Sequence, residues 1–109
     1  MTVTDLMNAL TLTPVSLPEG DREVEGVYIG DLLSWVMGRA QSGNVWLTIM
    51  SNLNIAAVAT LSDVSCILLC EGVTLEETVK NTAEAKGVNI LATDKTAYET
   101  AKRLAELGL

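Results

Sequence analysis

Three short apolar runs set the architecture of this chain, because each is too short for a buried helix and each is followed by a segment with helical spacing. The runs are residues 45–50 (VWLTIM), 64–70 (VSCILLC) and 88–93 (VNILAT). Their apolar content is continuous rather than alternating, which is typical of parallel strands buried on both faces. Strands that alternate with helices form a parallel sheet covered by helices. We therefore expect an α/β fold with three α/β/α layers and a mostly parallel sheet of about four to five strands.

Two further strands are expected nearer the start of the chain. Residues 12–17 contain Pro14, which lacks a backbone N–H and therefore favours an edge position over a central one. Residues 23–29 have strand character despite Gly26.

Helices are expected at residues 1–10, 31–40 and 55–61, the first beginning near Thr4 or Asp5. The best-punctuated helix covers residues 74–87, where Thr74 and Glu77 fit a capping box and Gly87 fits the left-handed position that ends a helix. A last helix is expected to begin at Asp94, with one face made of Ala97, Tyr98, Ala101, Leu104 and Ala105.

The length and the apolar content point to one self-associating domain. A chain of 109 residues corresponds to a single domain, residues 1–109. Hydrophobic residues make up 49% and the mean hydropathy is +0.32, which is more than a small monomer readily hides. We therefore expect a homodimer, in which Trp35 and Trp46 lie either at the contact or in the core.

The net charge of −7 argues against nucleic acid as a partner, because an acidic protein repels phosphate backbones and the seven basic residues form no run. A membrane partner is not expected either. The N-terminus lacks a basic region followed by an apolar one, and the uncharged residues 44–62 are interrupted by Ser51, Asn52 and Asn54. These features predict a soluble, cytoplasmic protein.

Polar and small residues follow four of the expected strands: Gly30 and Asp31, Ser51 and Asn52, Glu71 and Gly72, and Thr93 and Asp94. Ligands of parallel sheets bind beyond the carboxyl ends of the strands, so these eight residues are the candidate ligand-binding set. For Asp31 and Asp94 the alternative is helix capping, which needs no ligand. We expect both roles to coexist at Asp31, and Asp31, Ser51, Asn52, Glu71 and Thr93 to face one concavity.

Catalytic signatures are absent, which predicts a protein that is not an enzyme. The chain has no histidine, no G-x-x-x-x-G-K-[ST] phosphate loop, no G-x-G-x-x-G and no C-x-x-C. Cys66 and Cys70 are expected on one face of a strand, roughly 13 Å apart at about 3.3 Å per residue, which is too far to pair. We expect them to be buried, with a redox or metal role as the alternative. No catalytic or metal-binding residue is predicted, and the sequence names no cofactor.

Residues 27–101 resemble the DRTGG domain family. The matching features are a Y-[IV]-G-D turn into a helix at Tyr28 to Asp31, an apolar strand ending in polar residues, a strand ending in Glu71-Gly72, and an L-x-T-x-x-x-[AT]-[YF] segment from Leu91 to Tyr98. The D-R-T-G-G signature itself is missing, and only the Asp21-Arg22 pair is similar to it.

The resemblance implies a three-layer α/β fold similar to the N-terminal domain of HPr kinase/phosphorylase, which lacks the kinase active site. It also implies a role in regulation and dimerisation, since such domains occur inside phosphotransacetylases and between CBS domains of regulatory pyrophosphatases. We expect a non-catalytic, homodimeric regulatory module that binds a small molecule or nucleotide. The alternatives are an interaction module without ligand, docking on itself or on a larger enzyme, and a phosphotransfer enzyme.

Overall fold

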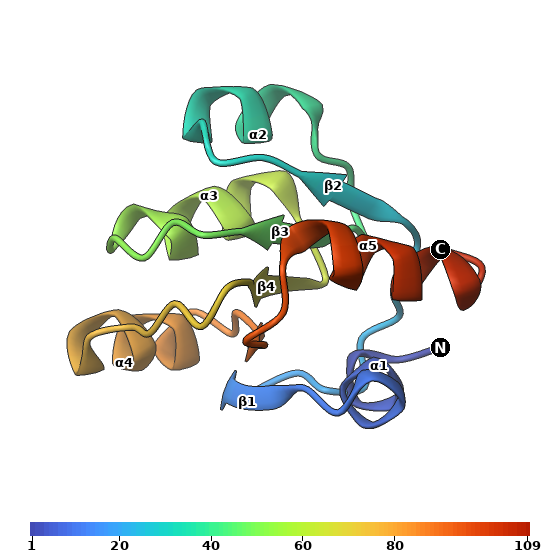
Figure 1. The fold of residues 1–109 in the computed structure, drawn as a ribbon. Helices are drawn as coiled ribbons and strands as arrows, with labels where there is room; N and C mark the ends of the chain where they lie inside the picture. The colour runs from blue at the N-terminus through green and yellow to red at the C-terminus, as the bar shows by residue number, and fades with distance from the viewer.

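The apolar runs form the middle of a five-stranded sheet in the computed structural model, which describes residues 1–109 (Figure 1). The strands lie in the order β1-β5-β4-β3-β2, parallel except for the antiparallel pair β1 and β5. The strands are β1 (Thr13–Ser16), β2 (Val27–Ile29), β3 (Val45–Thr48), β4 (Cys66–Leu69) and β5 (Ile90–Ala92). The helices are α1 (Val3–Leu10), α2 (Leu33–Arg39), α3 (Asn54–Ser62), α4 (Glu77–Ala85) and α5 (Ala97–Glu106).

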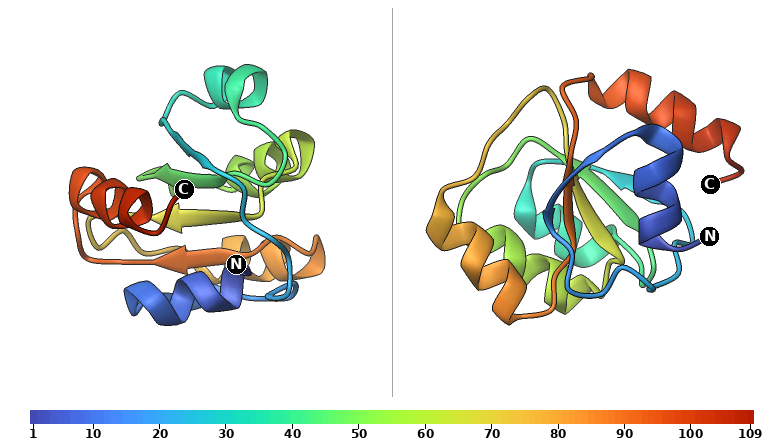
Figure 2. Two further views of the ribbon diagram at one scale, coloured as in Figure 1. Left: turned by 90° about the vertical axis from the view of Figure 1, so that its right-hand side faces the viewer. Right: turned by 90° about the horizontal axis from the view of Figure 1, so that it is seen from below.

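Helices cover both faces of the sheet, which confirms the three-layer α/β fold (Figure 2). Successive side chains of a strand point to opposite faces, and in β4 Ile67 belongs to one apolar cluster and Leu68 to the other. The cluster around Ile67 is covered by α2, α3 and α4, and the cluster around Leu68 by α1 and α5. Every residue of β3 and β4 is buried, as expected for central parallel strands.

The prediction that Pro14 lies in an edge strand is confirmed, since β1 pairs only with β5. Buried polar groups fix this edge. The Ser16 hydroxyl donates to the carbonyl of Val88 at 2.8 Å. The Asn89 side chain exchanges hydrogen bonds with the backbone of Glu19 at 2.8 and 2.9 Å. The chain between β1 and β2 is therefore held to the start of β5.

Two helices begin at capping boxes that differ from the expected ones. Thr2 caps α1, in place of the expected Thr4 or Asp5, and Thr96 caps α5, in place of Asp94. In each box the threonine hydroxyl accepts from the backbone N–H three residues on, and the acidic side chain there accepts from the threonine N–H. The expected box at Thr74 is wrong because α4 begins later, at Glu77, with no side-chain cap.

The predicted end of α4 is confirmed, whereas the predicted face of α5 is only partly buried. Gly87 has φ of +72°, which confirms the left-handed residue beyond α4. The residues expected on one face of α5 differ in burial. Leu104 is buried and Ala97 and Ala101 are half-buried, whereas Tyr98 and Ala105 are exposed; Thr100 is the other buried residue of the helix. The helix axis is set by its packing on the sheet, and a threonine takes an inward position by donating to the carbonyl of Thr96 at 2.8 Å.

The strands are shorter than the sequence predicts. Gly26 has φ of +120°, a conformation that L side chains rarely adopt, and the regular part of β2 begins only after it. The two tryptophans differ in burial. Trp46 is fully buried in β3 and donates to the Gly30 carbonyl at 2.8 Å, whereas Trp35 of α2 is 53% exposed. Trp46 is therefore a core residue, and only Trp35 is free to contact a partner.

Both cysteines are buried and unpaired, as expected. They belong to the cluster between the sheet and helices α1 and α5. Burial raises the pKa of the Cys66 thiol to about 12, and burial also raises the pKa of Cys70. A thiol held protonated in an apolar layer is a poor nucleophile and a poor metal ligand. None of the helices is long and apolar enough to cross a membrane.

Candidate functional site

Four loops meet at the carboxyl-terminal edge of the sheet, because β2, β3, β4 and β5 run parallel. These loops carry the eight residues that the sequence predicts as ligand-binding. The structure gives them different surroundings, and they fall into three groups.

Asp31 joins the ends of β2 and β3. Its Oδ1 atom accepts from the Thr48 hydroxyl at 2.8 Å and from the Ile49 N–H at 3.0 Å. The prediction that Asp31 caps the following helix is wrong, since α2 begins after Leu32 and has no side-chain cap. The carboxylate instead holds the loop after β3 beside the loop after β2. Gly30 is fixed there too, because its carbonyl accepts from Trp46 and its N–H donates to Leu47.

The loops after β4 and β5 are tied together by backbone hydrogen bonds. The N–H of Glu71 donates to the carbonyl of Lys95 at 2.8 Å, and the N–H of Gly72 donates to the carbonyl of Thr93 at 3.0 Å. Glu71 and Gly72 both have left-handed φ values, +62° and +74°. A Cβ at Gly72 would meet no atom within 4 Å, so the residue borders open space. The turn favours glycine there for its backbone conformation rather than for lack of room.

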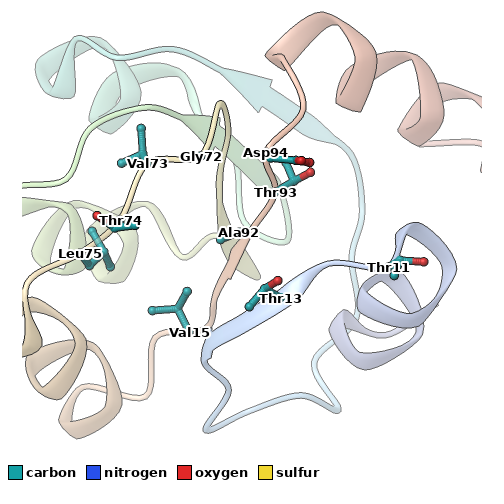
Figure 3. Close-up of a pocket in the computed structure, with 10 residues that line it drawn as sticks. All are labelled: Thr11, Thr13, Val15, Gly72, Val73, Thr74, Leu75, Ala92, Thr93 and Asp94. Atoms are coloured by element: carbon teal, nitrogen blue, oxygen red, sulfur yellow. The ribbon is translucent and has the colours of Figure 1, made fainter.

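A first pocket of about 610 Å³ opens beside this pair of loops (Figure 3). Its walls come from β1, from the loop after β4 and from the end of β5. Threonine hydroxyls and apolar side chains dominate the lining, Asp94 is its only charged residue, and it contains no Lys or Arg. The lining residues are Thr11, Thr13, Val15, Gly72, Val73, Thr74, Leu75, Ala92, Thr93 and Asp94.

A second pocket of about 570 Å³ lies at the starts of α3 and α4. Thr74 lines both pockets, so the two adjoin. The Asn52 Oδ1 atom accepts from the Asn54 N–H at 2.9 Å at the start of α3, whereas no side chain caps α4. The second pocket is lined by Ser51, Asn52, Leu53, Thr74, Glu76, Thr78 and Val79.

The structure thus divides the predicted set. Gly72, Thr93 and Asp94 line the first pocket, Ser51 and Asn52 line the second, and Gly30, Asp31 and Glu71 line neither. The single concavity expected for Asp31, Ser51, Asn52, Glu71 and Thr93 does not form, because Asp31 turns its carboxylate to β3.

Residues 73–75 and the β1 side of the first pocket were absent from the predicted set. Residues 73–75 follow Gly72 directly, so extending that loop to the start of α4 could have found them. Thr13 and Val15 reach the pocket because β1 pairs with β5. That pairing has no local sequence signal.

The Asp21-Arg22 pair that resembles part of the family signature lies outside this site. The Asp21-Arg22 pair is near the opposite edge of the sheet, where Arg22 Nη2 lies 2.7 Å from Asp63 Oδ1, just beyond the end of α3. Hydrogen bonds from Ser42 and from Arg22 lower the pKa of Asp63. No group of three His, Cys, Asp or Glu residues is placed to hold a metal ion.

The fold resembles that of the CBS and DRTGG domains of the regulatory region of Clostridium perfringens pyrophosphatase, a structure solved in complex with its activator, diadenosine tetraphosphate. The TM-score is 0.71 at 12% sequence identity, and the match covers 93% of this chain and 44% of that one. At this identity the likeness concerns the fold alone. A search of curated proteins found no matching relative. The sequence profile of the DRTGG domain matches residues 5–107, and the chain therefore belongs to the DRTGG domain family.

Proposed function

We propose that this chain is a non-catalytic regulatory module that forms a homodimer and binds a small molecule or nucleotide at the carboxyl-terminal edge of its sheet. The observation that carries the ligand proposal is the pair of adjoining pockets that share Thr74. Pockets at this edge of a parallel sheet, lined by apolar side chains and a few polar groups, are the usual form of a small-molecule site. The resemblance in fold to part of a regulatory region supports the regulatory role.

The two pockets suit different parts of a ligand. In the first, Val15, Leu75 and Ala92 offer apolar contacts to a flat ring, and the threonine hydroxyls can bond to its edge or to a sugar. The second includes the start of α4, where N–H groups without a side-chain cap favour a negative group. Asp94 and Glu76 each place a carboxylate in the lining, without a compensating cation. A nucleoside or a nucleotide with few phosphates fits these charges better than a polyphosphate.

The absence of an activated nucleophile supports a non-catalytic role. Neither pocket contains a cysteine, a lysine or a histidine, and no serine or threonine hydroxyl in the linings donates a hydrogen bond to the Asp94 or Glu76 carboxylate. Asp94 makes no hydrogen bond that would position it for proton transfer. The surrounding side chains can bind and orient a ligand, and binding alone is sufficient for a regulatory module.

A thermal-shift panel of nucleosides, mononucleotides, dinucleotides and common metabolites tests the ligand proposal. A ligand of the folded state at 100 times its Kd stabilises that state by about 2.7 kcal/mol, which raises the Tm. Thr74 is exposed and its side chain makes no hydrogen bond, so Thr74→Trp should place a bulky ring at the boundary of the two pockets, obstruct a ligand there and abolish the shift. Thr74→Ser is the matched control and should keep it.

The other outcomes separate the alternatives. A panel in which no compound raises the Tm of the native chain favours an interaction module without ligand. A shift that survives Thr74→Trp places the ligand elsewhere. Stoichiometric phosphate transfer from ATP by the purified chain, abolished by a substitution in that chain, contradicts the non-catalytic role.

A further inference from the structure

The charges of this acidic protein are distributed unevenly along the chain. It has 14 Asp and Glu residues, yet residues 32–62 contain none of them, and Arg39 is the only charged residue in that range. The range, called the neutral segment below, includes α2, β3 and α3. Because β3 is buried, the neutral segment meets solvent mainly through the two helices and their loops. Part of the surface is therefore free of the carboxylates that cover the rest.

Large apolar side chains are exposed in this same segment. Five of them are between 45% and 59% exposed. Some of these residues lie on α2 or next to it. Ile49 is near the start of α2, because its N–H donates to Asp31, and Leu53 precedes α3, a helix that packs against α2. We call four of them the α2 face: Leu32, Trp35, Ile49 and Leu53. Met37 is excluded, because it lies two positions after Trp35 and therefore on the other flank of the helix.

The position of α2 leaves this face without a covering element. β2 is the edge strand of the sheet and pairs only with β3, and α2 is the outermost helix of its layer (Figures 1 and 2). Val36 is the only buried residue of this seven-residue helix. A helix this short depends on tertiary packing for its stability. α2 is therefore the helix that gains most from a partner.

We infer that the α2 face binds the α2 face of a second copy of this chain. This inference rests on the homodimer of the proposed function and names its interface. A protein with a net charge of −7 repels its own copy wherever carboxylates meet, and the neutral segment is the surface where two copies approach without that repulsion. Trp is also among the residue types enriched in protein interfaces, and Trp35 is 53% exposed.

Charge complementarity fixes the orientation of the pair. The Arg39 guanidinium lies 3.7 Å from the centre of the Trp35 ring, at the end of α2, and forms no salt bridge. Asp31 precedes the start of α2, and its Oδ2 atom has no hydrogen-bond partner. A two-fold axis that places the two α2 helices antiparallel brings Arg39 of each copy toward Asp31 of the other. It also keeps the two Arg39 side chains apart.

A stable dimer must bury more surface than α2 alone can offer. A standard interface buries about 800 Å² per partner, roughly a seventh of the 5531 Å² surface of this chain. α2 is only about 10 Å long, at about 1.5 Å per residue. Ile49 and Leu53 must therefore contribute, together with the free edge of β2.

Sedimentation equilibrium of the full chain tests this interface. The native chain is expected at twice 11.6 kDa at micromolar concentration. Trp35→Glu places a carboxylate in the α2 face and should give a monomer. Tyr98→Glu is the matched control, because Tyr98 is an aromatic residue that is 78% exposed on α5, on the opposite face of the sheet; this variant should remain a dimer. Far-UV circular dichroism verifies that each variant is folded, and Leu32→Glu, at a residue that is 59% exposed and three positions before Trp35, replaces Trp35→Glu if the latter unfolds.

The remaining outcomes overturn the inference in distinguishable ways. A native dimer that persists in folded Trp35→Glu, or in folded Leu32→Glu, leaves the proposed homodimer standing and shows that its interface lies elsewhere. A native chain that is monomeric throughout the micromolar range contradicts both the homodimer and this interface, and assigns the α2 face to a different protein. Leu53 lines the second pocket as well, but Trp35 and Leu32 line neither pocket, so these substitutions leave the ligand site unchanged and the thermal-shift panel measures ligand binding separately.

Discussion

Replacing Asp31 with alanine is expected to destabilise the fold, whereas the same change at Asp94 is expected to have little effect. Both aspartates follow a parallel strand and precede a helix, so the same role is predicted for both from the sequence. Their hydrogen bonds in the structure differ. Asp31 accepts hydrogen bonds from Thr48 and Ile49, and the Asp94 carboxylate accepts none.

The size of the effect follows from the two hydrogen bonds that are lost. A hydrogen bond to a charged group contributes about 1.5–3 kcal/mol, and less where water can replace the partner. Since Thr48 is buried but Asp31 is exposed, Asp31→Ala should cost about 2 kcal/mol in total. The entropy of unfolding is about 0.23 kcal/mol/K for 109 residues, so the Tm should fall by about 9 °C. Asp94→Ala should cost less than about 0.5 kcal/mol, or about 2 °C.

Thermal and urea unfolding followed by circular dichroism measure these changes, with all variants at one protein concentration because a dimer has a concentration-dependent Tm. Asp31→Asn keeps the Oδ1 acceptor and should lose about half as much stability as Asp31→Ala. A double-mutant cycle with Thr48→Val should give a coupling energy of about 1 kcal/mol. Equal losses of Tm in Asp31→Ala and Asp94→Ala, or additive effects of Asp31→Ala and Thr48→Val, would refute the reasoning.

Two further expectations concern α5 and the cysteines. Thr96→Ala removes the capping box that Thr96 forms with Glu99 and should lower the free energy of unfolding by about 1 kcal/mol. Thr74→Ala should leave the midpoint of urea unfolding unchanged, because Thr74 caps no helix. Similar urea midpoints for the two variants would contradict these assignments. Neither Cys66 nor Cys70 should react with a thiol reagent at pH 8 in the folded chain, because both are buried and the pKa of Cys66 is about 12, and both should react in urea. Labelling of Cys66 in the folded chain at the rate of a free thiol would show that the layer between the sheet and α1 and α5 is open.

The layers of this fold could be predicted from sequence because burial leaves a local pattern. Runs such as residues 64–70 are apolar on both faces, and that pattern predicts a central parallel strand wherever its neighbours lie. Pro14 could be assigned to an edge for an equally local reason, the missing N–H. These features depend on a few consecutive residues and on no knowledge of the rest of the chain.

Helix starts were harder to predict, because several small polar residues before a helix can each serve as a cap. Thr96 rather than Asp94 caps α5, and neither Thr74 nor Glu76 caps α4 with its side chain. The path of each loop decides which residue lies one position before the first helical turn. That path depends on contacts such as the one between Asp31 and β3, which exist only after the strands have paired.

The candidate site was predicted in part for the same reason. The carboxyl ends of parallel strands meet at one edge, so Ser51, Asn52, Gly72, Thr93 and Asp94 could be placed beside pockets. The wall supplied by β1 could not, because it requires β1 to return to β5 in the opposite direction.

The pairing of β1 with β5 also has a consequence for synthesis on the ribosome. Thr13 pairs with Ala92, and Ser16 bonds to the carbonyl of Val88, a residue made 72 positions later. The parallel strands β2, β3 and β4 can assemble in the order in which they emerge, but the N-terminal segment has no strand to join until β5 has left the exit tunnel. Contacts of such long sequence separation slow folding. The nascent chain therefore carries β1 unpaired until residues 90–92 have emerged, and β5 then joins β1 to the rest of the sheet.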